Sequence, residues 1–192
     1  MIEKEILKTL RMLEIRIGTS FTVEQSGYGK EVIEKLENEG FLEKRETGYV
    51  TTQKMREVIR VILTGGVYDI LHCGHAFFLQ KCKELCDILV VVVAADSTVM
   101  KIKNRKPVHG ALARAALVGS LKPVDLAVVG DPEDKLKVVK RVNPNAVAFG
   151  YDQKNGEVEM CKKLGLEVIR VDKFLEGDMY KTSGIIKSLR SN

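Results

Sequence analysis

Two of the three histidines in this 192-residue chain lie within four residues of each other, in a glycine-rich segment. The segment runs from Gly65 to His75 and reads GGVYDILHCGH. Glycine lets a backbone turn sharply and come close to a ligand. An imidazole can donate a hydrogen bond to a phosphate oxygen as negative charge develops on it. His72 and His75 therefore predict a site for phosphoryl chemistry.

Three cations follow further along the chain. Lys103, Arg105 and Lys106 belong to the run KNRKP, and such side chains bind the oxygens of phosphates; a solvated basic loop is the alternative. The net positive charge lies in the same part of the chain. Residues 1–60 contain 11 basic and 11 acidic residues, whereas residues 61–192 contain the remaining 20 and 15 of the chain's 31 and 26. This excess predicts an anionic ligand.

The histidines and cysteines have other interpretations. His72 and His75 are also spaced as a metal pair, with Cys73 or Cys82 as a further ligand, although the neighbouring glycines would then be unexplained. A purely structural role is the second alternative. The four cysteines form no CxxC pair, so we expect free thiols. Cys82 and Cys86, four residues apart on a predicted helix, are better explained by packing than by metal or redox chemistry.

Short apolar strands alternate with amphipathic helices from residue 61 onward. This alternation predicts an α/β fold, a Rossmann-like doubly wound parallel sheet with helices on both faces. The expected strands are Val61–Thr64, Ile88–Ala94, Leu126–Val129, Ala146–Phe149 and Val168–Val171. The expected helices are His75–Cys86, Ala111–Ser120, Glu133–Arg141, Glu157–Lys163 and Ser183–Leu189. Ligands of such sheets bind at the carboxyl ends of the strands, so functional residues should follow the strands directly.

Residues 1–58 have a different pattern and predict a separate small domain, with residues 61–192 as the second. Two helical stripes, the second ending at Gly40, precede a hairpin over Phe41–Thr52. This order resembles a winged helix–turn–helix. The presumed recognition helix, 30–39, carries two cations and four carboxylates and would repel DNA, so an architectural or subunit-contact role is favoured.

The glycine-rich segment resembles the cytidylyltransferase-like nucleotidyltransferase superfamily. Its motif is G-x-F-D-x-x-H-x-G-H, and the segment Gly66–His75 departs from it only in having Tyr68 for Phe. The resemblance implies that an acceptor phosphate attacks the α-phosphate of a nucleoside triphosphate in line, that pyrophosphate leaves, and that both histidines stabilise the transition state. It also implies a divalent cation, Mg²⁺ by preference.

Further blocks extend the resemblance over residues 61–192. It implies nucleotide binding by Gly65, Gly66, Val67, Tyr68, Asp69, His72, Gly74, His75, Gly150, Asp152, Thr182 and Ser183. It implies catalytic roles for His72, His75, Lys103 and Arg105, acceptor binding by Asp96, Lys106, Arg114 and Asp125, and cation binding by Asp69 and Asp96. An N-terminal helix cap is the alternative role for Asp96.

The blocks GYDQ and KPVD look most like the archaeal FAD synthases of this superfamily, which adenylylate FMN. The arginine that glycerol-phosphate cytidylyltransferases carry before Thr182 is missing, and Arg170 is a candidate to replace it. We therefore expect ATP and FMN as substrates. The alternatives are a cytidylyltransferase that uses CTP and a polyol phosphate, and a winged-helix transcription regulator with a nucleotide-sensing domain.

Several expectations concern the setting of the protein. No apolar run reaches the roughly 18 residues that a membrane span requires. The N-terminus mixes charged and apolar residues and does not resemble a secretory signal, so we expect a cytoplasmic enzyme that does not contact membranes. Family habit suggests a homodimer.

Overall fold

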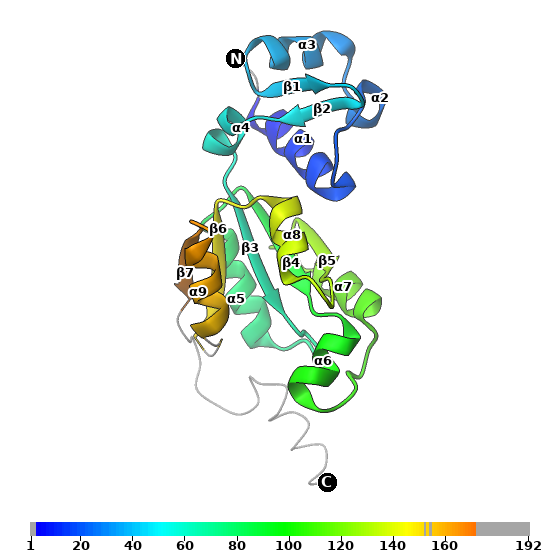
Figure 1. The fold of residues 1–192 in the computed structure, drawn as a ribbon. Helices are drawn as coiled ribbons and strands as arrows, with labels where there is room; N and C mark the ends of the chain where they lie inside the picture. The colour runs from blue at the N-terminus through cyan, green and yellow to red at the C-terminus, as the bar shows by residue number, and fades with distance from the viewer. Residues whose placement is uncertain (1–2, 152, 154, 172–192) are drawn as a thin grey trace.

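The computed structural model describes residues 3–151, 153 and 155–171. Its centre is a five-stranded parallel sheet in the order β5-β4-β3-β6-β7 (Figure 1). The strands are β3 (Val61–Gly66), β4 (Ile88–Val93), β5 (Leu126–Val129), β6 (Ala146–Gly150) and β7 (Glu167–Val171). All five expected strands are thus confirmed, each to within two residues at either end.

Helices cover both faces of this sheet. They are α5 (Cys73–Lys83), α7 (Ala111–Gly119), α8 (Lys135–Val142) and α9 (Asn155–Lys163), while α6 (Asp96–Lys103) lies beyond the end of β4 (Figure 1). Side chains alternate between the two faces along β3. Ile62 belongs to the buried cluster that contains Leu79 of α5, whereas Leu63 belongs to the cluster that contains Val138 of α8. The doubly wound architecture is confirmed, while α6 was not predicted and the expected helix 183–189 lies outside the described residues.

The N-terminal part consists of helices and one hairpin. Its elements are α1 (Lys4–Ile17), α2 (Val23–Ser26), α3 (Lys30–Asn38), β1 (Leu42–Arg45), β2 (Gly48–Thr51) and α4 (Gln53–Val58). Helix α3 is followed by Gly40 in the left-handed conformation, with a φ of 78°. The two helical stripes and the hairpin are confirmed. The winged-helix classification and the domain division stay predictions, because one cluster of buried side chains joins Leu10 of α1 to Val142 of α8.

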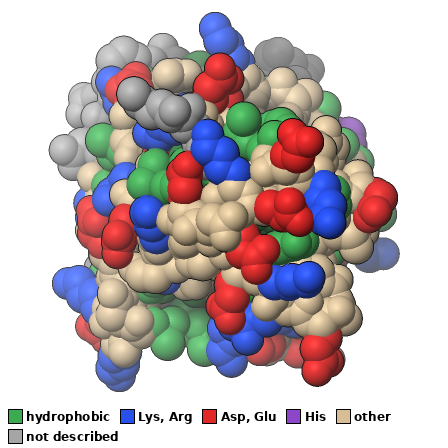
Figure 2. Space-filling view, turned by 90° about the horizontal axis from the view of Figure 1, so that it is seen from above, with side chains coloured by type: hydrophobic (Ala, Val, Ile, Leu, Met, Phe, Trp, Pro, Cys, Tyr) green, Lys and Arg blue, Asp and Glu red, His purple; other side chains and the backbone are tan. Residues whose placement is uncertain are grey.

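The N-terminal part lies at the end of the sheet where the strands begin (Figure 1). Lys4 pairs with Asp87 at 2.7 Å and Lys8 with Asp125 at 3.2 Å, and these carboxylates directly precede β4 and β5. Figure 2 views the molecule from this end and shows acidic and basic side chains interspersed, without one uniform basic patch. The opposite end of the sheet, where the strands finish, is left to the glycine-rich segment.

Two smaller expectations can be compared with the structure. All four cysteines are free thiols, as predicted. Cys82 is fully buried on α5, which agrees with a packing role, and the Cys86 thiol donates to the Cys82 carbonyl at 3.4 Å from just beyond the helix. No helix among the described residues has both the length and the apolar character that a bilayer crossing demands.

Candidate active site

The candidate site lies where β3, β4 and β6 end. In the strand order, chain direction along the sheet reverses at β3: the chain moves from β3 to β4 and β5 on one side and then to β6 and β7 on the other. Such a switch point leaves a crevice between the neighbouring strand ends, here β3 and β6. The segment that follows β3 and opens α5 therefore borders the crevice.

The two histidines stack on each other at the beginning of α5. Their ring centroids are 3.8 Å apart, with 23° between the ring planes. His72 is the N-cap residue, in extended conformation, and it makes no side-chain capping bond. His75 lies in the first turn, where its N–H bonds the His72 carbonyl. Both imidazoles thus stand at the positive end of a helix dipole, where a phosphate is stabilised.

Both imidazoles are poised to be neutral at physiological pH. Burial lowers the pKa of His72, and burial together with the nearby His72 lowers the pKa of His75 to about 4. A neutral imidazole still has one N–H to donate. The Nδ1 atoms of both rings are buried and have no hydrogen-bond partner among the described residues. The arrangement therefore offers ring nitrogens that a phosphate oxygen could engage.

Tyr68 packs its buried ring against His75 of the histidine pair. Its side chain is 3% exposed, its φ is 51°, and its ring centroid lies 5.0 Å from that of His75. The ring also lies against Gly66, where an added Cβ would come within 2.8 Å of it. Packing therefore requires glycine at position 66, because the aromatic ring two residues later occupies the space that a Cβ would need.

Asp69 anchors the basic loop to the glycine-rich segment. It is almost fully buried, accepts from the Val108 N–H at 2.6 Å and pairs with Arg105 at 2.6 Å. One carboxylate thereby fixes both flanks of the loop that follows α6. Lys103, the last residue of α6, and Lys106 of this loop are exposed and have no ion pair among the described residues, so their charges are available to a ligand.

Arg114 is the most buried charged side chain of the site. It is 0% exposed and donates to the carbonyls of Val67 at 2.6 Å, Ala94 at 2.7 Å and His109 at 2.9 Å. It also pairs with Asp96 at 2.6 Å. One guanidinium therefore ties the segment after β3, the end of β4 and the start of α7 together. Because the Arg114 guanidinium donates to groups within the protein, Arg114 is better placed to position these segments than to contact the acceptor substrate, which is the role that the sequence suggests.

Asp96 keeps one carboxylate oxygen for other partners. It is the first residue of α6, and its side chain is 51% exposed. Arg114 donates to Oδ1, and Oδ2 accepts no hydrogen bond from the described residues. Among the described residues, no three His, Cys, Asp or Glu side chains cluster as a metal centre would require, so the His–Cys metal alternative gains nothing from the geometry.

Gln153 links the two strand ends across the switch point. Its Nε2 donates to the Gly65 carbonyl at 2.9 Å, and its Oε1 accepts from the Gly150 N–H at 2.8 Å. Arg170 donates to the carbonyls of Gly150 at 3.2 Å and Gln153 at 3.1 Å. The sequence marked this block as typical of relatives but gave Gln153 no role. Its signal was only the position directly after a strand.

The structure separates some predicted site residues from the rest. Asp125 precedes β5 and pairs with Lys8 and Lys83, so it lies at the opposite end of the sheet from the histidines. That location does not support the predicted acceptor contact, because residues before a parallel strand and residues after it lie at opposite edges. Asp152, Thr182 and Ser183 lie outside the described residues.

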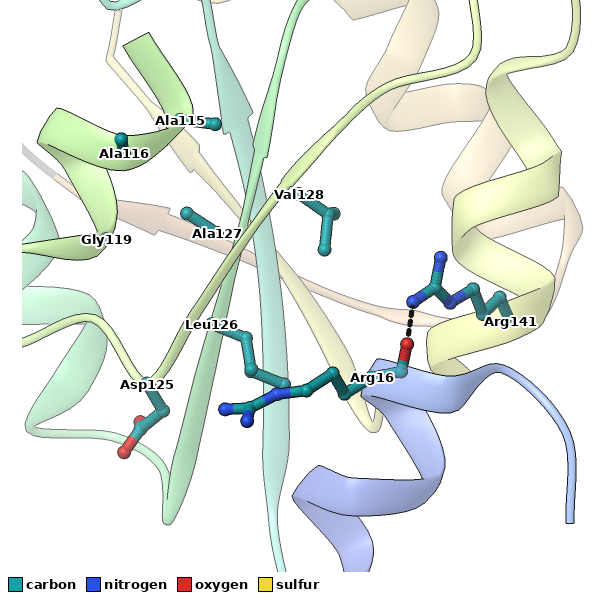
Figure 3. A pocket seen from close by; sticks show the side chains of 9 residues that line it. All are labelled: Arg16, Ala115, Ala116, Gly119, Asp125, Leu126, Ala127, Val128 and Arg141. Carbon is teal, nitrogen blue, oxygen red and sulfur yellow. Dashed lines mark hydrogen bonds between the residues drawn. The ribbon is translucent and has the colours of Figure 1, made fainter. Parts of the chain in front are cut away.

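A cavity of about 350 Å³ lies beside β5 and does not include the histidines (Figure 3). It is lined by Ala115, Ala116 and Gly119 of α7, by residues of β5, and by Arg16 and Arg141. The candidate site is therefore defined by its converging polar groups and strand ends rather than by this cavity.

Comparison with known proteins agrees with this geometry. The family model described as cytidylyltransferase-like matches residues 63–187. A FAD synthase from Aciduliprofundum boonei is 46% identical over 67% of this chain and 89% of its own length. FAD synthases from Thermococcus sibiricus and Pyrococcus abyssi are each 43% identical, over 70% and 68% of this chain and 94% and 92% of their own lengths.

Solved structures share the fold of the second part. A protein from Thermoplasma volcanium, titled lipopolysaccharide core biosynthesis protein, is 39% identical, with a TM-score of 0.57 over 61% of this chain and 99% of its own. A pantoate–β-alanine ligase from Francisella tularensis, at 14% identity and a TM-score of 0.50, covers 68% of this chain and 65% of its own and supports the fold alone. The chain belongs to the cytidylyltransferase-like family and is a nucleotidyltransferase.

Proposed function

We propose that this enzyme transfers the adenylyl group of ATP to FMN and so forms FAD and pyrophosphate. The observation that carries the choice of substrates is the 46% identity to a FAD synthase that spans 89% of that relative. The stacked histidines at the start of α5 supply the matching chemistry. A terminal phosphate oxygen of FMN attacks the α-phosphorus of ATP, the bond to the β-phosphate oxygen breaks, and its electrons leave with pyrophosphate.

The histidines act as hydrogen-bond donors to the reacting phosphate. His72 and His75 are neutral in the free protein, because their pKa values are lowered. Each contributes one N–H toward the oxygens of the α-phosphate, where negative charge grows in the transition state. Neither forms a bond to phosphorus. Lys103 and Lys106 attract the triphosphate and the FMN phosphate, since both ammonium groups are exposed beside the segment that Asp69 anchors.

Arg114 and Gln153 are positioning residues in this proposal. Arg114 holds the Val67 and Ala94 carbonyls and thus the relative placement of the ends of β3 and β4. Gln153 holds the ends of β3 and β6. Together they set the width of the crevice into which the nucleotide binds, without touching the reacting atoms.

A divalent cation is implied by the family, and Asp96 fits it best. Mg²⁺ in such sites is held by one or two carboxylates and by substrate phosphates, and Asp96 has a free oxygen in an exposed carboxylate. Asp69 is buried, its Oδ1 accepts from the Val108 N–H and its Oδ2 pairs with Arg105 by proximity without a hydrogen bond, so we assign it to loop anchoring instead. When bound, Mg²⁺ would neutralise charge on the triphosphate and its leaving group. The homodimer and the cytoplasmic location stay predictions.

The test is a product assay with the full-length protein. FMN, ATP and MgCl₂ are incubated with the enzyme, and FAD and pyrophosphate are quantified by chromatography and a coupled assay. FAD formed in a one-to-one ratio with pyrophosphate supports the proposal. A parallel reaction contains CTP and glycerol 3-phosphate. A CDP-alcohol in that reaction, with no FAD in the first across several divalent cations, would assign the enzyme to the cytidylyltransferases.

A further inference from the structure

Arginines dominate the seam between the N-terminal part and α8. Arg11 of α1 donates to the carbonyls of Val142 at 2.7 Å and Asn143 at 3.2 Å, at the end of α8. In the other direction, Arg141 of α8 donates to the carbonyls of Ile15 at 2.9 Å and Arg16 at 2.5 Å, at the end of α1. Figure 3 shows Arg141 meeting the Arg16 carbonyl there. The two helix ends are thus fastened reciprocally by guanidinium groups.

A cavity of about 280 Å³ opens in this seam. Its lining includes Arg11, Glu14, Arg56, Lys140, Arg141 and Asn143. These residues come from both parts of the chain. The cavity lies at the end of the sheet where the strands begin, because Asn143 precedes β6, and it is therefore separate from the histidine site.

The charge around this cavity is not balanced. Four of its lining side chains are cationic, and one, Glu14, is anionic. The Glu14 carboxylate is already engaged by the Arg11 guanidinium and by the main-chain N–H and hydroxyl of Thr51. Lys140 is exposed and has no hydrogen bond or ion pair among the described residues. The cavity wall therefore carries a net charge of three positive units.

Two guanidinium groups at this cavity have unused donors. The Nε atoms of Arg11 and Arg56 are buried and have no hydrogen-bond partner among the described residues, and Arg11 is only 3% exposed. Burial, and after it the charge of Arg11, lowers the pKa of Arg56, so the two cations repel each other. Glu14 neutralises only one of these two cations, and a buried N–H without an acceptor is unfavourable. Both costs would be removed by one anion with several oxygens.

We infer that this cavity binds a small phosphorylated molecule, at a second site distinct from the catalytic one. Guanidinium groups match the oxygens of a phosphate, and Arg56, Lys140 and Arg141 surround the space. The volume lies just below the range of about 300–1,000 Å³ for small-molecule pockets, which suits a phosphate or a small phosphate monoester better than a dinucleotide. The inference rests on the seam alone and does not depend on the identity of the acceptor.

The bound phosphate would tighten the docking of the N-terminal part. Its contacts come from α1 and α4 on one side and from α8 on the other. A ligand that binds only the docked arrangement stabilises it according to its concentration and affinity. The N-terminal part thereby gains a role that needs neither DNA nor the reacting groups: it completes a site that senses a phosphorylated metabolite.

The test measures phosphate binding to the full-length protein by isothermal titration in a phosphate-free buffer. Inorganic phosphate and ribose 5-phosphate are the two probes. The variants are Lys140→Gln and the double variant Arg56→Gln/Lys140→Gln. Lys44→Gln is the matched control, since it removes the same charge from an exposed side chain of β1 that does not line the cavity. His75→Ala reports any phosphate bound at the catalytic site.

Lys140→Gln should weaken binding several-fold, and the double variant by about 10-fold or more, because charge-assisted bonds are lost. Lys44→Gln and His75→Ala should retain the wild-type affinity for this site. Tighter binding of ribose 5-phosphate than of inorganic phosphate would identify the ligand as a monoester, and equal binding as free phosphate. Wild-type affinity in Lys140→Gln and the double variant, or equal weakening by Lys44→Gln, would overturn the inference. Lys140→Gln alone decides the matter if Arg56→Gln unfolds.

Discussion

Gly66→Ala should damage the enzyme, whereas the same substitution one residue earlier should not. At Gly66 an added Cβ would lie 2.8 Å and 2.9 Å from two carbons of the Tyr68 ring. At Gly65 the nearest atom is the Val92 carbonyl oxygen at 3.5 Å, an ordinary contact. Neither glycine has a positive φ, so alanine suits the backbone at both positions. The two variants therefore differ mainly in the contact with Tyr68.

The magnitude follows from the surroundings of the ring. Tyr68 is 3% exposed and has a φ of 51°, so it has little room to move away. Overpacking of this kind costs about 1–3 kcal/mol of unfolding free energy. For a chain of this length each kcal/mol corresponds to about 2–4 °C in Tm. Gly65→Ala should be neutral or slightly stabilising, because a Gly→Ala change restricts the unfolded chain.

The functional effect should pass through the histidine. The centroids of the Tyr68 and His75 rings are 5.0 Å apart, so a displaced Tyr68 should move the imidazole that we propose as a donor to the α-phosphate. We expect a lower kcat for Gly66→Ala and a near-normal kcat for Gly65→Ala. The measurements are thermal unfolding and steady-state formation of pyrophosphate.

A double-mutant cycle isolates the cause. In a Tyr68→Ala background the ring is absent, so the further change Gly66→Ala should cost much less than it does in the wild type. The coupling should recover most of the 1–3 kcal/mol. Equal stability of Gly65→Ala and Gly66→Ala, or additive effects of Gly66→Ala and Tyr68→Ala, would refute the steric explanation.

The remaining predictions concern the same site. His72→Ala and His75→Ala should each lower kcat about 100- to 1000-fold with the fold intact by circular dichroism, and near-normal turnover would contradict their assigned role. The pKa of His75 is lowered to about 4 in the folded protein, so below pH 6.5 the unfolded chain binds more protons than the folded one. The free energy of unfolding should therefore fall by up to about 3 kcal/mol between pH 6.5 and pH 4. Urea titrations should show this loss in the wild type and a smaller loss in His75→Gln. Lys103→Ala and Lys106→Ala should raise the KM for ATP or FMN, and unchanged kinetics in both would return the loop to a solvated role. Gln153→Glu should raise the KM for ATP, because a carboxylate oxygen would replace the amide that donates to the Gly65 carbonyl and would repel that carbonyl. Gln153→Ala removes the hydrogen bond without adding repulsion, and equal KM values for Gln153→Glu and the wild type would contradict the bridging role.

The sequence predicts the sheet well because its three central strands, β4, β3 and β6, are mostly buried and nearly continuous in apolar residues. Ile88–Val93 is an example. Helix α6 was missed, since its eight residues bury only Val99 and carry charges at both ends. Helix α5 begins at Cys73, two residues before the predicted start, because His72 caps it without a side-chain bond that a sequence pattern could reveal.

The sequence predicts the positions of site residues that lie together in one short segment after a strand. It predicts less well the residues whose positions depend on contacts between distant segments. The histidines and glycines follow β3, as the fold rule requires. The interior position of Arg114 could not be foreseen, because its carbonyl partners come from three segments. Asp125 was placed at the site by resemblance, although it precedes its strand. No sequence pattern predicts the seam between α1 and α8, because the residues that join it, such as Arg11 and Val142, are 131 residues apart in the chain.

The central position of β3 has a consequence for the order in which the chain folds during synthesis. This strand is made early, yet it pairs with β6, and the Thr64 hydroxyl bonds the Ala148 carbonyl 84 residues later. The apolar side chains of α1 likewise complete their buried cluster only after Val142 has been synthesised. Pairings between distant segments form slowly, and incompletely paired strands expose surfaces that aggregate. A nascent chain that has not yet released residue 148 therefore holds β3 with β4 on one side and an unpaired edge on the other, so we expect aggregation to be a hazard chiefly at the ribosome-bound stage.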